Sequence, residues 1–158
     1  MKDERPASPN FREARPEEAS ALAGFQLALA LETEGLALDA QACGRGVRAV
    51  FDDPAKGRWF VATAGRELAA SLLVTPEWSD WFDGSIWWIQ SVYVLPEHRG
   101  RGLYSGLYDF VKALATLEPS VRGLRLYVDK TNIKAQKVYA ALGMSDEHYA
   151  LYEWMKPS

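Results

Sequence analysis

Residues 92–103 read Val-Tyr-Val-Leu-Pro-Glu-His-Arg-Gly-Arg-Gly-Leu. A nearly continuous apolar stretch from Ser85 to Leu95 leads into them, and an amphipathic helical pattern follows from Leu103 to Leu117. The glycines between the two allow the backbone to turn so that several N–H groups converge, and the helix that follows adds a partial positive charge. The stretch therefore predicts a strand, an anion-binding loop and a helix, with a phosphate or pyrophosphate as the natural ligand.

Two other phosphate-binding loops fit these residues poorly. A Walker-A loop would end in Gly-Lys-Ser/Thr, which is absent, and a dinucleotide fingerprint would have a third glycine where Ser105 stands. A tight turn from strand to helix, with no ligand, is the alternative reading of the glycines, and the loop by itself leaves that alternative open.

The remaining elements follow from the spacing of apolar residues and from turn residues. In chain order we expect a strand at 10–14, a helix from Pro16 that is interrupted at Gly35, a helical stretch within 39–51, a hairpin of strands 59–63 and 67–75, a loop at 76–84, strands at 85–95 and 124–128, helices at 103–117 and 135–142, and a last strand at 149–155. Strands and helices alternate in the second half, which predicts an α/β sheet with a parallel crossover through helix 103–117.

The composition is that of a folded globular chain. The 158 residues are 48% hydrophobic and 25% charged, with a net charge of −3. We expect one domain, 11–158, after a flexible N-terminal segment, 1–10. No basic stripe points to nucleic acid, and no apolar run is long enough to span a membrane. The single cysteine, Cys43, offers neither a disulfide nor a structural metal site, so we expect a cytoplasmic protein without a metal.

A second motif strengthens the loop assignment. Asn132 is followed at fixed spacing by Ala135, Val138, Tyr139, Leu142, Gly143 and Met144. Together with residues 92–103, this order resembles the two cofactor motifs of the GNAT family of N-acetyltransferases, and the tryptophan-rich stretches are similar to those of a bacterial subgroup of undefined substrate. Arg99 and Gly102 match the first and fourth positions of the family's loop, whereas Tyr104 stands at the sixth, where the family usually has glycine or alanine.

The resemblance implies a fold and a set of cofactor contacts. The fold is a mixed, mostly antiparallel sheet of about six to seven strands, with a central parallel pair splayed for acetyl-CoA and helices on both faces. The cofactor-binding residues that it implies are Val92, Tyr93, Val94, Arg99, Gly100, Arg101, Gly102, Leu103, Tyr104 and Asn132. Asn132 would look the same from sequence if it only capped the following helix.

The resemblance also implies catalytic roles. Acetyl transfer to an amine needs a base for the acceptor ammonium and an acid for the departing thiolate. Tyr139 aligns with the family's acid, although a packed helix tyrosine is the alternative. Gln90 stands where many relatives have a glutamate, so a direct carboxylate base is absent there. Glu34 is our first choice of base and Glu32 the second, while a water chain from Gln90 to a remoter carboxylate is equally allowed.

Aromatic residues suggest the acceptor pocket. We expect Trp78, Trp88 and Tyr127 to bind the substrate together with Glu34, because aromatic faces and carboxylates suit a cationic amine. Core packing is the alternative role for any one tryptophan. Strict strand alternation would place Trp88 and Val92 on one face of the sheet and Trp87 and Tyr93 on the other. The isolated His98 is expected at the surface.

These expectations combine into one function and its alternatives. The sequence predicts an N-acetyltransferase that moves the acetyl group of acetyl-CoA to a primary amine of a small molecule or peptide, without nucleic acid or membrane as a partner. A non-catalytic acetyl-CoA or CoA-binding module is the main alternative, and a nucleotide-binding regulatory domain rests only on the glycine loop. A homodimer through the late strands is compatible with the pattern.

Overall fold

The computed structural model describes residues 8–158. These residues form two compact units, a first that ends at Arg125 and a second that spans Leu126–Ser158. Most of the predicted flexible segment 1–10 lies outside the described residues, and the first strand begins at Asn10. Within the described range, none of the helices is both long and apolar enough to cross a membrane.

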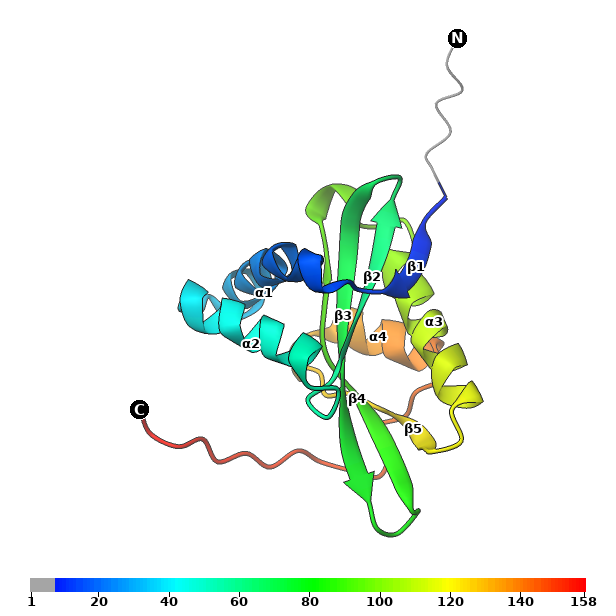
Figure 1. The fold of residues 1–158 in the computed structure, drawn as a ribbon. Helices are drawn as coiled ribbons and strands as arrows, with labels where there is room; N and C mark the ends of the chain where they lie inside the picture. The colour runs from blue at the N-terminus through cyan, green and yellow to red at the C-terminus, as the bar shows by residue number, and fades with distance from the viewer. Residues whose placement is uncertain (1–7) are drawn as a thin grey trace. The chain divides into compact units, whose positions relative to one another are not determined.

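The first unit contains nearly all of the regular structure (Figure 1). Its elements are β1 (Asn10–Glu13), a 3-10 turn (Pro16–Glu18), α1 (Ala19–Glu34), α2 (Ala40–Asp52), β2 (Arg58–Ala64), β3 (Glu67–Ser79), β4 (Gly84–Val94), a second 3-10 turn (Pro96–His98), α3 (Leu103–Leu117) and β5 (Val121–Arg125). The second unit contains α4 (Ile133–Ala141). The predicted order of strands and helices is confirmed up to α4, but β5 spans Val121–Arg125 rather than the predicted 124–128.

The strands form one mixed sheet in the order β1-β2-β3-β4-β5. The first three pairs are antiparallel, and β4 pairs with β5 in parallel through the α3 crossover. The predicted mixed, mostly antiparallel architecture is therefore confirmed. The described residues supply five strands rather than six to seven, because residues 149–155 form no strand.

Helices cover both faces of the sheet in the first unit, as predicted. On one face, Leu22 of α1 and Val47 of α2 pack with Trp59 and Val61 of β2. On the other face, the ring of Phe60 meets the ring of Phe110 of α3 edge-on, with 6.0 Å between ring centroids. Consecutive residues of β2 thus point to opposite helical layers, which explains why Trp59 to Ala62 are all apolar and buried.

A bulge at Gln90 changes which side chains of β4 share a face. Leu73 of β3 pairs with Ser91 and Val74 pairs with Ile89, so Gln90 is the extra residue. The bulge shifts the alternation, and Trp88 therefore lies on the same face as Tyr93 while Val92 shares the other face with Trp87. The predicted facing of these residues is wrong, because strict alternation holds only in an unbroken ladder.

The hairpin between β3 and β4 is longer than predicted. Residues 76–79 continue the ladder, with Pro76 opposite Trp87 and Trp78 opposite Ser85, so only 80–83 form the turn. The expected loop at 76–84 is thus mostly strand. The end of α1, by contrast, follows the prediction: Gly35 ends it in a left-handed conformation, with φ of 63°. At the start of α2, Asp39 caps the helix by accepting from Ala42 N.

Candidate functional site

The glycine loop places two left-handed residues at the start of α3. Gly100 has φ of 73° and Gly102 has φ of 76°, a region that glycine enters without steric cost. Gly102 is the N-cap of α3 and offers no side chain to cap it, and the first helical hydrogen bond runs from Gly106 N to Gly102 O. The backbone N–H groups in the first turn of α3 therefore have no acceptor within the helix and can bind a group from outside it.

The space above this loop is open. In the described part of the chain, no atom beyond the adjoining residues lies within 4 Å of the position that a Cβ would occupy at Gly100 or at Gly102. Both glycines are also exposed. An anion can therefore approach the backbone at this point, where the helix dipole favours negative charge.

The parallel strand pair ends before the loop. Among the described residues, β5 pairs with β4 only from Ser85 to Trp88, whereas β3 pairs with β4 as far as Val94. Residues 89–94 of β4 thus lie outside the ladder with β5. The pairing stops at Trp88 because its partner Arg125 is the last residue of β5, which leaves the backbone edge of residues 89–94 without a β5 partner.

Arg99 links the loop to β4 and to the end of α1. Its Nε donates to the carbonyl oxygen of Val94 (2.9 Å) and its Nη2 donates to Glu32 Oε2 (2.7 Å). The guanidinium also lies 5.6 Å from the centroid of the Tyr93 ring. Tyr93 is buried beneath α1, where its ring lies 5.4 Å from that of Phe25, and its hydroxyl donates to Glu32 Oε1 (3.2 Å).

The contacts of this network shift the pKa values of Glu32 and Tyr93. The Arg99 hydrogen bond holds the pKa of Glu32 below its ordinary value, and the Tyr93 hydrogen bond acts in the same direction. Burial, and then the bond to Glu32, raises the pKa of Tyr93. Glu32 is therefore a carboxylate at neutral pH and Tyr93 keeps its proton. Sequence reasoning gave Glu32 second place, since no local pattern reveals which α1 carboxylate faces β4.

The other predicted residues of this region differ in exposure. Leu103 is buried, so only its backbone can face a ligand, and Tyr104 is half-buried on the first turn of α3. Arg101 and Gln90 are exposed. Glu34 is exposed at the last position of α1, two residues beyond Glu32.

His98 does not lie at the surface as predicted. It is buried, and its Nε2 lies 3.0 Å from Glu67 Oε2 at the start of β3. The short turn at Pro96–His98 directs the ring inward, which a sequence with no regular period at this position does not reveal.

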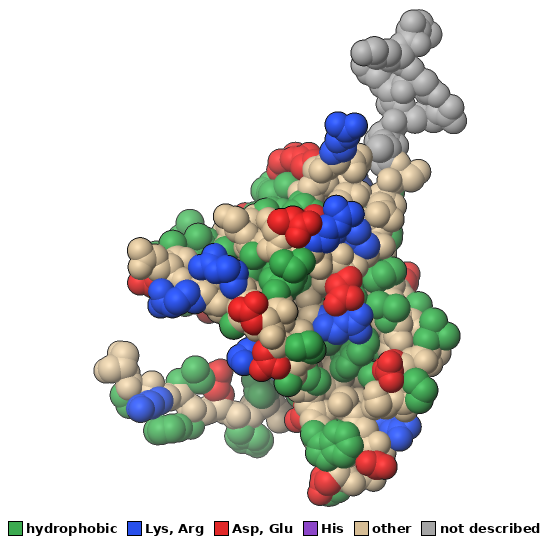
Figure 2. Space-filling model, viewed as in Figure 1, with side chains coloured by type: hydrophobic (Ala, Val, Ile, Leu, Met, Phe, Trp, Pro, Cys, Tyr) green, Lys and Arg blue, Asp and Glu red, His purple; other side chains and the backbone are tan. Residues whose placement is uncertain are grey.

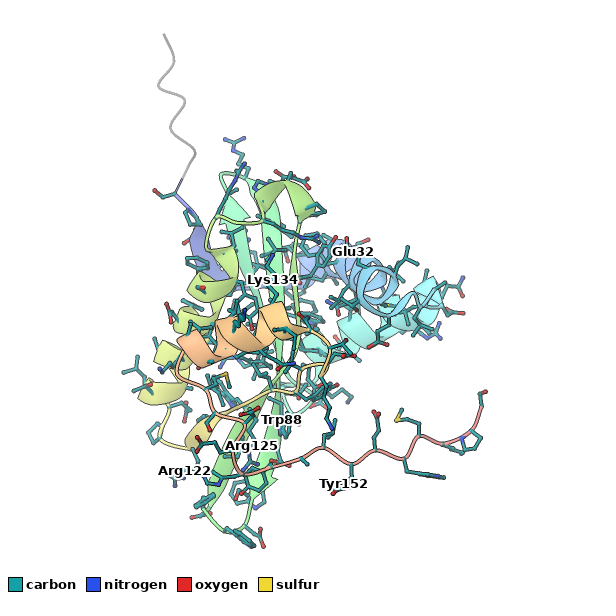
Figure 3. The ribbon with its side chains drawn as sticks, turned by 180° about the vertical axis from the view of Figure 1, so that it is seen from behind. Glu32, Trp88, Arg122, Arg125, Lys134 and Tyr152 are labelled. Carbon is teal, nitrogen blue, oxygen red and sulfur yellow. The ribbon has the colours of Figure 1, made fainter. Side chains whose placement is uncertain are left out.

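The predicted acceptor residues of the first unit are not brought together. Trp88 lies opposite Thr75 in the ladder and Trp78 lies three residues further along β3, so their side chains leave opposite faces. Trp78 is 65% exposed. Trp88 pairs in register with Arg125, and both are labelled in Figure 3. Arg125 Nη1 in turn donates to Glu77 Oε2 (3.0 Å) on β3, which lies on the other side of β4.

The second unit contains the other motif. Asn132 Oδ1 accepts from Ala135 N (3.0 Å) and thereby caps α4, the capping role that the sequence left open. Tyr139 is half-buried on α4, and the helix ends before Gly143 as predicted. Tyr127 is exposed.

The surroundings of Cys43 and of the described His, Asp and Glu side chains do not favour nucleophilic or metal chemistry. Cys43 is half-buried in α2, and burial raises the pKa of its thiol, so it is a poor nucleophile. Within residues 8–158, no three His, Cys, Asp or Glu side chains gather in a way that could hold a metal ion.

The glycine loop and the edge of β4 are compatible with the acetyl-CoA site that the sequence resemblance implies. The cofactor's pyrophosphate needs converging N–H groups with room above them, which the open space at Gly100 and Gly102 provides. Its extended pantetheine arm needs an unpaired strand edge, which residues 89–94 of β4 provide on the side of β5.

The fold and this loop define an acetyltransferase, and comparison with known proteins identifies its family. The acetyltransferase (GNAT) family matches residues 25–144, and the chain belongs to this family. Members of the family use acetyl-CoA. A search of curated proteins finds no match to the chain.

Solved structures share the fold over nearly the whole chain. A possible acetyltransferase from Clostridium difficile 630 is 38% identical, with a TM-score of 0.89 over 95% of this chain and 99% of its own. An integron cassette protein from the mobile metagenome of Cole Harbour Salt Marsh is 22% identical, with a TM-score of 0.81 over 94% and 91%. The aminoglycoside N-acetyltransferase AAC(6')-Iy, solved with CoA, is 16% identical, with a TM-score of 0.78 over 98% and 99%.

Proposed function

We propose that this acetyltransferase transfers the acetyl group of acetyl-CoA directly to a primary amine of a small molecule or peptide. The observation that carries the proposal is the exposed glycine loop at the N-terminus of α3, next to a strand edge that β5 leaves unpaired. Membership of the family supports acetyl-CoA as the acetyl donor. The structural neighbours named as aminoglycoside acetyltransferases support a small-molecule amine as the acceptor.

The cofactor contacts follow from the chain's backbone. Acetyl-CoA, when bound, supplies the activated acetyl thioester. The N–H groups of residues 100–104 would hold the pyrophosphate, with Arg101 exposed beside them. The backbone of Val92 and Val94 would pair with the pantetheine arm, and an N–H of this strand would orient the thioester carbonyl. Arg99 would hold the loop in place through Glu32 and Val94 rather than carry the phosphates alone.

The acceptor side needs a proton acceptor and a cationic subsite. An alkylammonium has a pKa of about 10.4, so one of its protons must leave before its nitrogen can react. Glu34 remains our candidate base, and a water chain from Gln90 to a remoter carboxylate remains the alternative. Trp88 and Tyr127 remain candidates for acceptor contacts, whereas Trp78 leaves the opposite face of the sheet from Trp88. The net charge of −3 favours a cationic acceptor.

Replacing Tyr139 with phenylalanine tests the proposed acid. Loss of the hydroxyl should lower kcat by about 100-fold, because a general acid contributes roughly 10²–10⁴ to such a step. The dissociation constant for acetyl-CoA should stay unchanged, since the ring is kept. Thiol release and calorimetry measure the two quantities. A variant that keeps full kcat would show that Tyr139 only packs in its helix.

Glutamine substitutions at Glu34 and Glu32 separate a base from a positioning residue. Glu34→Gln should lower kcat by about 100-fold with little change in acetyl-CoA affinity. Glu32→Gln removes a charge that Arg99 and Tyr93 both contact, so it should weaken acetyl-CoA binding about three- to tenfold through the loop. Steady-state kinetics with varied acetyl-CoA distinguish the two effects, and the reverse pattern would assign the base to Glu32.

Calorimetric titration with acetyl-CoA, with ATP and NAD as controls, is the first experiment. Binding of acetyl-CoA alone supports the loop assignment and leads to a screen of aminoglycosides, polyamines and peptide amines for thiol release. Binding without turnover on any amine would favour a regulatory CoA-binding module. Tighter binding of ATP than of acetyl-CoA would overturn the proposed donor.

A further inference from the structure

His98 is buried in the turn that leads into the glycine loop. Among the residues that the structure describes, it is the only His, Lys, Arg, Asp or Glu that is buried. The turn at Pro96–His98 follows β4, and Gly100 stands two residues further on. A buried imidazole needs a hydrogen-bond partner, because a buried polar group without one destabilises the fold. The partner of His98 therefore affects the point at which the loop begins.

The partner of His98 is Glu67, the first residue of β3. Its Oε2 lies 3.0 Å from His98 Nε2. An ionised carboxylate can only accept hydrogen bonds, so the Nε2 atom carries a proton and donates. Glu67 pairs with Ala64 of β2 in the ladder, which fixes its backbone. All of these residues belong to the first unit, and the contact ties the start of the loop to the sheet.

This contact differs from the ion pairs at the surface. Figure 2 shows acidic and basic side chains next to one another on the face in view. In the pair Arg58–Glu13 the two side chains are 38% and 52% exposed, and pairs of this kind contribute little to stability. The side chain of His98 is only 11% exposed. Loss of Glu67 would therefore leave the Nε2–H group of His98 without this acceptor and largely shielded from water.

The next residue is held by a different element. Arg99 donates to Glu32 of α1 and to the carbonyl oxygen of Val94. Two consecutive residues thus bind different parts of the first unit, His98 to β3 and Arg99 to α1. The glycines at 100 and 102 follow directly, in left-handed conformations. Since glycine restricts the backbone least, the residues on either side decide where the N–H groups of the loop point.

We propose that His98 is a positioning residue for the acetyl-CoA loop, and that its hydrogen bond to Glu67 holds the loop in its binding conformation before the cofactor binds. This rests on the proposed function, because it takes the loop as the site of the cofactor. His98 acts through the backbone of residues 99–102 and does not touch the cofactor. A loop that is already ordered loses less conformational entropy on binding, so the contact strengthens acetyl-CoA affinity.

Calorimetric titration of the full chain with acetyl-CoA tests the contact. His98→Ala and Glu67→Ala should each raise the dissociation constant about tenfold, because each removes the link between the loop and β3. Charge alone predicts the opposite for Glu67→Ala, since loss of an acid near an anion site tightens binding. The double substitution should weaken binding no more than either single one, because both remove the same contact.

Two further variants are the controls. His98→Gln keeps a side-chain N–H group that can reach Glu67, so its dissociation constant should stay within about threefold of that of the unsubstituted protein. Glu97→Ala removes an exposed acid from the same turn but keeps the partner of His98, so it should not weaken binding. Circular dichroism checks that every variant folds.

Hydrogen exchange and NMR test the contact without any cofactor. The backbone amides of His98 and Arg99 donate within the turn, and they should exchange faster in His98→Ala and Glu67→Ala. The chain contains two histidines, so the spectrum of His98→Gln identifies the His98 imidazole signals by their absence. In the unsubstituted protein Nε2 should carry the proton, and Glu67→Ala should shift its resonance.

The outcomes separate the positioning role from the proposed function. Unchanged acetyl-CoA affinity in His98→Ala and Glu67→Ala, together with weaker binding in Gly102→Val, would overturn the positioning role and keep the loop as the cofactor site. Additive losses in the double substitution, or turn amides whose exchange neither variant changes, would also overturn it. Full acetyl-CoA affinity in Gly102→Val would instead overturn the proposed site itself, and with it any role of His98 in cofactor binding.

Discussion

Replacement of Gly102 by valine should raise the dissociation constant for acetyl-CoA by about 100-fold or more. Gly102 has φ of 76°, where a β-branched residue is strained by about 1–2 kcal/mol. The new side chain would also enter the open space above the loop, where it would separate the pyrophosphate from the N–H groups of α3. Calorimetry with acetyl-CoA measures the effect directly.

The control substitution introduces a similar backbone strain at a position away from the loop. Gly65 has φ of 62° in the exposed turn between β2 and β3, so Gly65→Val carries a similar conformational cost away from the loop. It should lower the melting temperature about as much as Gly102→Val and leave acetyl-CoA affinity unchanged. Equal acetyl-CoA affinity in both valine variants would show that the loop is a turn and not part of the binding site.

Replacement of Gly57 by alanine should lower the free energy of unfolding by about 3 kcal/mol. Gly57 is buried just before β2 with φ of 149°, and a Cβ there would lie 2.4 Å from the backbone oxygen of Val74. That oxygen belongs to the middle of β3 and cannot move without disturbing the ladder. Overpacking combined with backbone strain costs about this much. Urea unfolding measures it, and the melting temperature should fall by roughly 6–12 °C.

The matched substitution Gly24→Ala should have the opposite sign. Gly24 is exposed within α1, and among the described residues no atom beyond its own helix lies within 4 Å of the Cβ position. Alanine is the better helix former by about 0.5–1 kcal/mol, so the free energy of unfolding should rise by that amount. A loss of stability at Gly24, or none at Gly57, would contradict the packing described here.

The network around Arg99 connects the donor loop to the helix expected to border the acceptor. Glu32 of α1 holds both Arg99 in the loop and Tyr93 in β4. A substitution of Glu32 should therefore affect the loop through Arg99, even without contact between Glu32 and a cofactor. For this reason Glu32 is better tested through cofactor affinity, and Glu34 through the rate of acetyl transfer.

Local patterns were sufficient to predict most of the elements. The run of apolar residues in β2, the helical spacing in α3 and the stop at Gly35 depend only on neighbours along the chain. The two motifs also predicted the family, since glycines and asparagine at fixed spacing meet backbone requirements that are local. The glycine turn before α3 was thus predictable from its own residues.

Long-range contacts decided what the sequence alone left open or placed wrongly. The bulge at Gln90 arises from the register between β3 and β4, and it moved Trp88 to the face of Tyr93. His98 is buried, and its Nε2 lies 3.0 Å from Glu67 Oε2, 31 residues earlier in the chain. The hydrogen bond from Arg99 to Glu32 joins residues that are 67 positions apart in the chain. Residues 149–155 have the pattern of a strand, yet pattern alone provides no partner, because a strand forms only where another backbone edge accepts its hydrogen bonds.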